Sequence, residues 1–454
     1  MKILKGKIIS FIVILILCKL QAMTQSIYSD IKFNSLLRSN SGGWIAGDAT
    51  YSIDLPDNRT LWLFGDSFIG TVNEDGSIVQ GAKMIRNCAL IMDNDSLRAL
   101  YGGTFENPSE FIQTTMPDST WYWPDHGIVE NNILKIFLAK FTTDPNGTPG
   151  WNFVYAGHDV ASFSFPEIQL IEINELPYYS ENAVLYGDRL FRDSIYTYIY
   201  GRKDHTVSEY KIPYPHIART TGDISNNWEF YNGSNWSDDP TATEPINNFQ
   251  VSQQYCVFKH QNKYILITQD IWLSANIYSF TSNSPVGPWE NKKILYTTPI
   301  VYDNTFTYNA YAHPQFDENN ELLISYNTNG DFWEIFNNVE IYRPNFIRVP
   351  YELIDNDFAA NLITIKKKDK LYSFELYPNP AQNEITLEFV AANNDNTEFT
   401  IYNTKGQIEK RINNNIVPGA CTKTINISAL PHGIYYCVLK NRENCVTKKL
   451  IKID

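Results

Sequence analysis

Five segments of this chain share one plan, and this repeat constrains the fold more than any other feature of the sequence. In each segment a polar residue opens a strand, a turn rich in Asn, Asp or Gly follows, and a second strand rich in aromatic residues returns. The segments span residues 47–67, 124–141, 180–204, 252–270 and 308–329. Their opening residues lie 55 to 77 residues apart, so each interval can hold one four-stranded sheet.

Helical periodicity is weak across these segments, and no β-α-β unit can be traced. The sequence therefore predicts an all-β fold, with a five-bladed β-propeller over residues 27–358. The alternative is a β-sandwich or barrel whose hairpins are similar by accident. Aromatic residues make up 14% of the chain and charged residues 19%, which is typical of a folded, β-rich protein.

In a propeller the innermost strands surround an axial funnel, where a ligand meets the side chains at the strand ends. The five segments open on polar residues, which we expect to line this funnel: Asp48, Asp125, Glu181, Gln253 or Gln254, and Asn309. Solvated strand ends would also be polar, because Asp and Asn suit turns. Several polar openings together favour a binding site.

The first hairpin predicts a pair of carboxylates. Its turn, residues 55–59, is symmetric about Asp57, so Asp48 should face Asp66. Directly opposed Cβ atoms lie about 4.5–5.5 Å apart, and like charges that close raise at least one pKa. Glycoside hydrolysis uses such a pair, one carboxyl as proton donor and the other as nucleophile or base.

We therefore predict Asp48 and Asp66 as catalytic, with Glu181 and Asp125 as the next candidates. Asp66 follows a strongly apolar strand, so it is the expected proton donor. In one alternative, Asp48 acts as base and Glu181 as acid across the funnel. In another, Asp66 only caps a turn and Asp48 is only solvated.

Side chains near the same openings are candidates for binding sugars. Aromatic rings stack on sugar faces, although most aromatic residues of a propeller pack between blades. His313 lies in the last inner strand, either as a hydrogen-bonded core residue or beside an axial cation. No cofactor and no dedicated metal site are predicted, since calcium-loop spacing is missing from the sequence. The candidates are Trp44, Trp121, Trp123, Tyr179, Gln254, Tyr255, Tyr308, Asn309, Tyr311 and His313.

Three motifs resemble a known family: GDATYSIDLPDNRTLWLFGDSFIG, SPVGPW and YNAYAHPQF followed by LLISYNTN. They are similar to secreted bacterial five-bladed propellers that carry the domain of unknown function 4185, and the similarity covers roughly residues 40–350. Some relatives are endo-acting D-arabinan hydrolases, and the wider superfamily includes arabinanase and β-xylosidase propellers. The resemblance implies a glycoside hydrolase and matches two aspartates to Asp48 and Asp66.

The composition changes after residue 354. Residues 359–370 form a predicted linker, and residues 371–454 alternate in polarity as expected of a small Ig-like β-sandwich. Five separated motifs in this region resemble the type A sorting domain of the type IX secretion system: YPNP, IYN, GQ, LPHGIY and KKLIK. This resemblance implies the type IX machinery as a partner.

The first 26 residues read as a secretory signal peptide. Three lysines precede an apolar run from Ile8 to Cys18, and small and polar residues follow, with cleavage expected between Ala22 and Ser26. A transmembrane anchor is the alternative, but the run is too short to span a bilayer comfortably. We expect no membrane span after removal of this peptide. Of the five remaining cysteines, Cys437 and Cys445 can form a disulfide.

The charge distribution argues against nucleic acid as a partner. Residues 1–19 contribute +4 and residues 371–454 contribute +1 to a total of −13, so residues 20–370 carry −18. A neutral glycan suits that surface better. The sequence thus predicts a secreted or surface-attached glycoside hydrolase acting on a polysaccharide, with an arabinan-like furanoside polymer as one candidate. The alternative is a non-catalytic glycan-binding or adhesive propeller.

Overall fold

The computed structural model describes two compact units, which divide between residues 360 and 361. The described residues are 26–40, 42–117, 119–147, 152–207, 210–271, 274–358, 374–391, 396–404, 407–415, 419–440 and 445–453. The predicted signal peptide, apart from Ser26, and the predicted linker at 359–370 lie outside them. Within these ranges, no helix is long and apolar enough to span a membrane.

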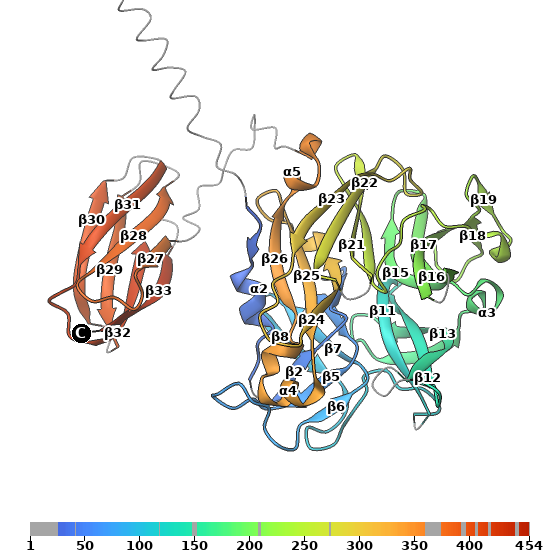
Figure 1. Cartoon of the computed structure of the whole chain (residues 1–454), viewed down its shortest axis with the longest axis horizontal. Helices are drawn as coiled ribbons and strands as arrows, with labels where there is room; N and C mark the ends of the chain where they lie inside the picture. The colour runs from blue at the N-terminus through green and yellow to red at the C-terminus, as the bar shows by residue number, and fades with distance from the viewer. Residues whose placement is uncertain are drawn as a thin grey trace, which may run out of the picture. The chain divides into compact units, whose positions relative to one another are not determined.

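Five antiparallel sheets of four or five strands follow one another along the described part of the first unit (Figure 1). The first contains β3 (Tyr51–Asp54), β4 (Thr60–Phe64), β7 (Cys88–Asp93) and β8 (Ser96–Leu100). The second contains β11 (Thr120–Glu130), β12 (Ile133–Thr143), β13 (Phe153–Ser164) and β14 (Leu170–Glu175). The third contains β15 (Leu185–Arg192), β16 (Tyr196–Val207), β17 (Tyr210–Thr221), β18 (Trp228–Tyr231) and β19 (Trp236–Ser237).

The fourth sheet contains β20 (Tyr255–His260), β21 (Lys263–Gln269), β22 (Asn276–Ser282) and β23 (Glu290–Thr297). The fifth contains β24 (Phe306–Ala312), β25 (Glu321–Asn329), β26 (Asn345–Pro350) and β1 (Tyr28–Ser29). Because β1 pairs with β26, the beginning of the unit is tied to its end. Each of the five predicted hairpin segments forms the first hairpin of one sheet.

Short elements decorate these sheets. β2 (Gly43–Gly47), β5 (Ser67–Gly70) and β6 (Lys83–Ile85) form a small sheet, and β9 (Gly102–Gly103) pairs with β10 (Pro108–Ser109). The α-helices are α2 (Ile31–Leu36), α3 (Tyr178–Asn182), α4 (Phe332–Asn337) and α5 (Tyr351–Ile354). The 3-10 helices are η1 (Pro240–Ala242), η2 (Pro314–Phe316), η3 (Val339–Tyr342) and η4 (Asn356–Phe358).

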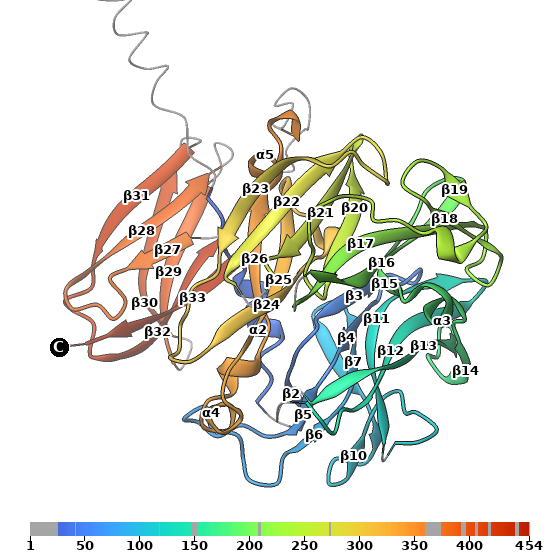
Figure 2. The same ribbon diagram turned by 45° about the vertical axis from the view of Figure 1, so that its right-hand side comes forward.

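The first strands of the sheets contact one another in series. β3 contacts β11, β11 contacts β15, β15 contacts β20, and β20 contacts β24. Figure 2 shows β3, β11 and β15 close together in the middle of the unit. One apolar core joins the first, second, fourth and fifth sheets, with Leu63, Leu138, Ile267 and Ile324 among its fully buried members. Burial of such side chains is the main stabilising contribution here.

The first hairpin has the register that its turn predicts. The amide of Leu55 donates to the carbonyl of Arg59 at 2.9 Å, and Asn58 adopts a left-handed conformation that Asn tolerates well. Tyr51 then lies opposite Leu63, as the symmetric turn requires. Every residue of β4 is buried, which explains its continuous apolar sequence.

A β-bulge interrupts β11, β15 and β24, each the first strand of its sheet. A bulge re-aims side chains at the point where the ladder shifts. The shifts lie between Pro124 and Gly127, between Tyr186 and Arg189, and between Tyr308 and Tyr311. They place Asp125, Asp188 and Asn309 within the bulges.

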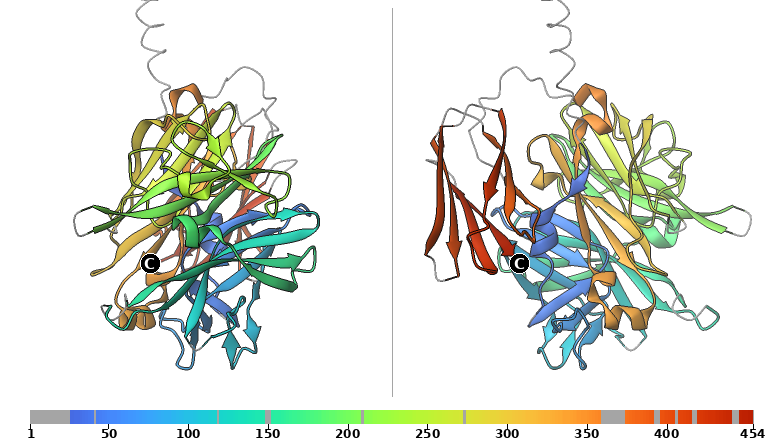
Figure 3. Two further views of the ribbon diagram at one scale, coloured as in Figure 1. Left: turned by 90° about the vertical axis from the view of Figure 1, so that its right-hand side faces the viewer. Right: turned by 60° about the vertical axis from the view of Figure 1, so that its left-hand side comes forward.

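The second unit packs two small antiparallel sheets around an apolar core (Figure 3). One sheet contains β27 (Phe374–Tyr377), β28 (Glu384–Ala391) and β31 (Gly419–Asn426). The other contains β29 (Asn396–Asn403), β30 (Ile408–Asn415), β32 (Gly433–Lys440) and β33 (Cys445–Lys452). The register pairs Cys437 with Lys448 and Cys445 with Lys440, about 10 Å apart along the strands. The predicted disulfide between Cys437 and Cys445 is therefore wrong, and Cys437 is a free thiol.

Candidate functional site

Asp48 and Asp66 meet at a gap between two ladders of the first hairpin. On one side of the gap, β2 pairs with β5 through Gly47 and Ser67. Within it, the amide of Asp48 donates to the carbonyl of Asp66 at 3.3 Å, and the amide of Gly65 donates to the carbonyl of Asp48 at 3.0 Å. The predicted register, in which Asp48 faces Asp66, is confirmed. We call these two residues the carboxylate pair.

Gly65 leaves room for the carboxylate pair. A Cβ atom at this position would lie 2.7 Å from Oδ1 of Asp48, closer than a side chain tolerates. Because β4 ends at Phe64, the chain can turn at Gly65 and place the carboxyl of Asp66 beside that of Asp48. This explains why a buried strand ends in Gly-Asp.

Asp48 is held by neutral phenols. Tyr308 Oη donates to Asp48 Oδ2 at 2.6 Å, and Asn329 Nδ2 donates in turn to Tyr308 Oη at 3.2 Å. Burial, and then the negative charge of Asp66, raise the pKa of Asp48 to about 7, although hydrogen bonds from Tyr308 and Tyr342 oppose this shift. The Asp48 carboxyl can therefore hold a proton near neutral pH.

Asp66 is held by a cation and an indole. Arg86 Nη1 lies 3.1 Å from Asp66 Oδ2, and Trp123 Nε1 donates to Asp66 Oδ1 at 2.9 Å. Burial raises the pKa of Asp66, whereas Arg86 and then Trp123 favour its ionised form. Its side chain remains 17% exposed, so a ligand can reach it. Within the described residues, Asp66 has an ion-pair partner and Asp48 has none, so the surroundings of Asp48 oppose its protonation less than those of Asp66 do.

A second acidic cluster is buried around Arg202. Arg202 Nη1 donates to Asp188 Oδ1 at 2.6 Å and lies 3.7 Å from Asp125 Oδ1, which also accepts from Tyr51 Oη at 3.1 Å. Burial raises the pKa of Asp188 to about 8 despite the opposing charge of Arg202. Burial also raises the pKa of Asp125. Within the described residues, Oδ2 of each carboxyl lacks a hydrogen-bond partner.

Glu181 does not lie at the predicted position. It is exposed on α3, which packs against β13 and η1 and lies at the edge of the unit in Figures 1 and 2. The strand begins only at Leu185, so the acid that it carries inward is Asp188. The dipeptide Gly187-Asp188 repeats Gly47-Asp48 and Gly65-Asp66, and this signal could have identified it.

Several predicted sugar-binding residues belong to the core instead. Trp44 is 3% exposed and packs on Phe64 with ring centroids 4.6 Å apart. Tyr255 and Tyr311 are fully buried, and their hydroxyls donate to backbone carbonyls. His313 is also fully buried, with Ser52 and Ser325 hydroxyls at its two ring nitrogens. These side chains stabilise the sheets.

Of the other candidates, Trp123 and Tyr308 hydrogen-bond the carboxylate pair. Gln254 is buried, with Nε2 donating to the carbonyl of Ala49 at 3.1 Å. The remaining residues are partly exposed: Trp121, Trp123, Tyr179, Tyr308 and Asn309. Sequence reasoning missed four polar side chains beside these acidic groups: Arg86 at Asp66, Tyr342 at Asp48, and Arg202 with Tyr155 in the second cluster. Within the described ranges, no group of three His, Cys, Asp or Glu side chains is placed to hold a metal ion.

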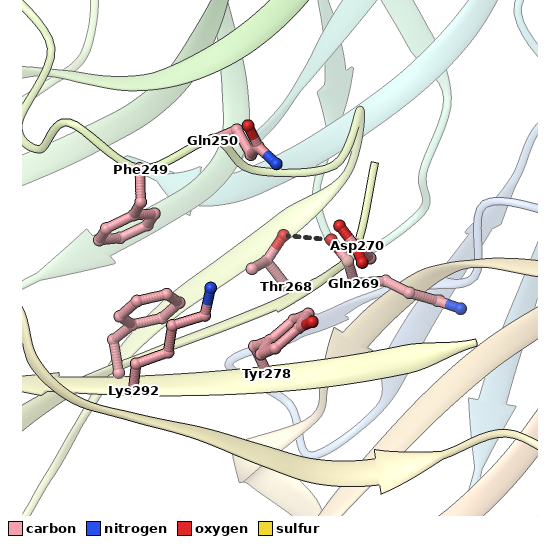
Figure 4. A pocket seen from close by; sticks show the side chains of 8 residues that line it. Phe249, Gln250, Thr268, Gln269, Asp270, Tyr278 and Lys292 are labelled. Atoms are coloured by element: carbon pink, nitrogen blue, oxygen red, sulfur yellow. Dashed lines mark hydrogen bonds between the residues drawn. The ribbon is translucent and has the colours of Figure 1, made fainter. Parts of the chain in front are cut away.

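A separate cavity of about 240 Å³ lies in the fourth sheet region (Figure 4). Thr268, Gln269 and Asp270 at the end of β21 line it together with Tyr278 and Lys292. Phe249 and Phe280 form a stacked wall with centroids 3.9 Å apart. None of the predicted site residues lines this cavity.

The fold and the site define an all-β protein with a pair of carboxylates beside partly exposed aromatic side chains. The chain belongs to the family of the domain of unknown function DUF5005, whose profile matches residues 30–352. This match does not confirm the resemblance to the domain of unknown function 4185.

Residues 375–453 match the secretion system C-terminal sorting domain. The predicted export by type IX secretion is thereby confirmed, and the protein is directed to the extracellular space or the cell surface. No curated protein sequence matches the chain significantly.

One of three solved structures compared with the chain shows a similar fold. A hydrolase candidate from Bacteroides ovatus is 24% identical with a TM-score of 0.62, and the alignment covers 74% of this chain and 95% of that one. An exo-β-1,3-galactanase from Phanerochaete chrysosporium is 11% identical with a TM-score of 0.38, covering 91% and 98%. A β-fructofuranosidase from Bombyx mori is 11% identical with a TM-score of 0.41, covering 90% and 87%. The first similarity shows the fold alone, and the other two are too weak to support a conclusion.

Proposed function

We propose that this protein is a secreted or surface-attached glycoside hydrolase that cleaves a polysaccharide with the carboxylate pair. The single observation that carries the proposal is the opposed, solvent-accessible pair itself, with Asp48 beside phenols and Asp66 beside Arg86. One carboxyl is thus suited to hold a proton while the other is ionised. Glycosidic bond cleavage requires these two states in neighbouring groups.

We also propose that the five sheets form a five-bladed propeller with this pair at one mouth of its axis. Two observations support the arrangement: the first strands contact one another in series, and β1 completes the last sheet. Pairing of the first and last strands would close such a ring.

In the proposed reaction, Asp48 donates its proton to the leaving glycosidic oxygen. Asp66 either attacks the anomeric carbon itself or activates a water molecule that attacks it. Arg86 keeps Asp66 ionised, and Trp123 fixes the orientation of its carboxyl. Directly opposed residues have Cβ atoms about 4.5–5.5 Å apart, which suits the separation of about 5–5.5 Å between the carboxyls of retaining enzymes. We therefore favour retention of configuration, with an arabinan-like polymer among the first substrates to test.

The test is release of reducing ends from a panel of neutral polysaccharides by the parent protein, Asp48→Asn and Asp66→Asn. We expect each variant to lose activity by a factor on the order of a hundred or more while its circular dichroism spectrum stays unchanged. Glu181→Gln, on exposed α3, is the matched control and should keep full activity.

Two results would replace this reading. If the parent protein binds a polysaccharide but releases no ends, the propeller is a glycan-binding or adhesive module. If Asp66→Asn keeps turnover while Asp188→Asn abolishes it, the acid lies in the Arg202 cluster, and the arrangement across the axis applies with Asp188 in the place predicted for Glu181.

A further inference from the structure

One face of the second sheet carries a row of large aromatic side chains. It consists of Trp121 and Trp123 on β11, Phe141 on β12, and Phe153 and Tyr155 on β13, and we call it the aromatic face. Ring centroids lie 6.1 Å apart for Trp121 and Trp123, 4.9 Å for Trp123 and Phe153, and 4.6 Å for Phe141 and Tyr155. Figure 2 shows β11, β12 and β13 side by side. The row therefore crosses three neighbouring strands.

These rings differ from core aromatics because they stay in contact with solvent. Phe141 is buried, whereas the other four members of the aromatic face are partly exposed. The opposite face of the same strands packs into the apolar core through Tyr122, Leu138 and Phe163, and it carries one buried polar group in which Lys140 pairs with Asp159 at 3.1 Å. A sheet that exposes aromatic rings on one face suits a ligand with an apolar surface.

The aromatic face begins at the carboxylate pair. Trp123 Nε1 donates to Asp66 Oδ1 at 2.9 Å, and the Arg86 guanidinium that pairs with Asp66 lies over the Trp121 ring, 4.6 Å from its centroid. At Tyr155 the hydroxyl donates to Gln253 Oε1 at 3.2 Å. Rings and polar groups are thus continuous from the site along the sheet.

We propose that the aromatic face binds an internal stretch of a neutral polysaccharide chain that runs outward from the carboxylate pair. This inference rests on the proposed function for the position of the cleaved bond, but the binding itself does not require cleavage. Sugar rings have apolar C–H faces that stack on aromatic side chains and hydroxyls that reach polar rims. Because residues 20–370 carry −18, a neutral polymer is favoured over a polyanionic one. Several rings in a row imply that affinity rises with chain length.

The binding test is affinity gel electrophoresis of the full-length Asp48→Asn protein, which leaves the polymer intact. The gels contain arabinan, galactan or xylan, and polygalacturonate is the anionic control. Trp121→Ala and Phe153→Ala, each added to Asp48→Asn, should weaken retention by a neutral polymer about tenfold. Trp236→Ala is the matched control, since it is a partly exposed tryptophan on β19 of the third sheet, and it should change retention less than twofold. Thermal melts establish that each variant is folded.

Cleavage by the otherwise unmodified protein separates this inference from the proposed function. Trp121→Ala should lower kcat/KM at least fivefold more for the polymer than for a trisaccharide of the same linkage. Equal losses for both substrates, unchanged retention of Trp121→Ala and Phe153→Ala, retention by polygalacturonate alone, or no retention by any neutral polymer would each overturn the inference. Retention that depends on Trp121 in a protein that cleaves nothing would uphold it and refute the hydrolase.

Discussion

Removing the charge of Asp48 should stabilise the protein at neutral and alkaline pH. In the folded protein the pKa of Asp48 lies at about 7, against an ordinary value of 3.8, because the carboxyl is buried and faces Asp66. Between these two values the folded state holds a proton that the unfolded chain has released, so stability falls as the pH rises from about 4 to about 7. Above pH 7 the ionised Asp48 lowers the free energy of unfolding by its full amount.

The size of this cost follows from the difference of about 3 pH units. At about 1.4 kcal/mol per unit it amounts to about 4 kcal/mol, and because Asp48 keeps some solvent contact we expect about 2 to 4 kcal/mol. Asp48→Asn has nearly the same shape, and its amide oxygen can still accept from Tyr308. The variant should therefore match the parent protein below pH 4 and exceed its free energy of unfolding by this amount at pH 8.

Urea unfolding at a series of pH values from 3.5 to 8.5 measures the difference. Asp57→Asn is a control whose effect on stability should have the opposite sign. Burial alone would raise the pKa of Asp57, but hydrogen bonds from Arg59 lower it. That carboxylate adds stability above its ordinary pKa, so its removal should cost up to about 1 kcal/mol at pH 8 and nothing at low pH. An Asp48→Asn variant that is less stable than the parent protein at pH 8, or whose difference does not change with pH, would refute the reasoning.

Three further predictions concern the same unit. Arg86→Met should raise the pKa of Asp66 further and so move the acidic limb of the pH–activity profile to higher pH, whereas Arg86→Lys should move that limb less. Gly65→Ala should lower the free energy of unfolding by about 1–3 kcal/mol in urea, because its Cβ would lie 2.7 Å from Asp48 Oδ1, and an unchanged midpoint would contradict the steric role. A fragment of residues 27–358 should fold and keep the activity of the full chain, and loss of activity in a folded fragment would show that the sorting domain contributes to the site.

The carboxylate pair was predictable because short-range geometry decides it. A symmetric turn at residues 55–59 fixes the register, and a register fixed at Tyr51 and Leu63 carries over to Asp48 and Asp66. The sorting domain was predictable for a different reason, since five motifs in a fixed order identify it.

The position of the repeated hairpin in the sequence did not predict which acidic residue of the third sheet is buried. The helix α3 intervenes before β15, so the residue that opens the segment, Glu181, ends on the surface. The bulge at Tyr186 to Arg189 then sets which side chain points inward, and a shift of one residue reverses the two faces of a strand. Asp188 is therefore fixed by an irregularity that alternation in the sequence does not reveal.

Partners from distant parts of the chain were also beyond sequence reasoning. Arg86 reaches Asp66 only because β5 and β6 return along the small sheet, and Tyr342 reaches Asp48 from η3. The candidate aromatic residues differ in burial, since Trp44 and Tyr311 lie in the core and Trp121 is partly exposed. Burial depends on which sheets pack together, and a single sequence contains that information only indirectly.

The carboxylate pair opposes the stability of the hairpin that holds it. A sheet built for structure alone keeps like charges apart, yet this hairpin places two carboxyls opposite each other and uses Gly65 to admit them. Phenols beside Asp48 and Arg86 beside Asp66 then give the two carboxyls different surroundings. Arrangements that cost stability persist where function requires them. The same substitution, Asp48→Asn, should therefore make the protein more stable and less active, and a purely structural pair would produce the first effect without the second.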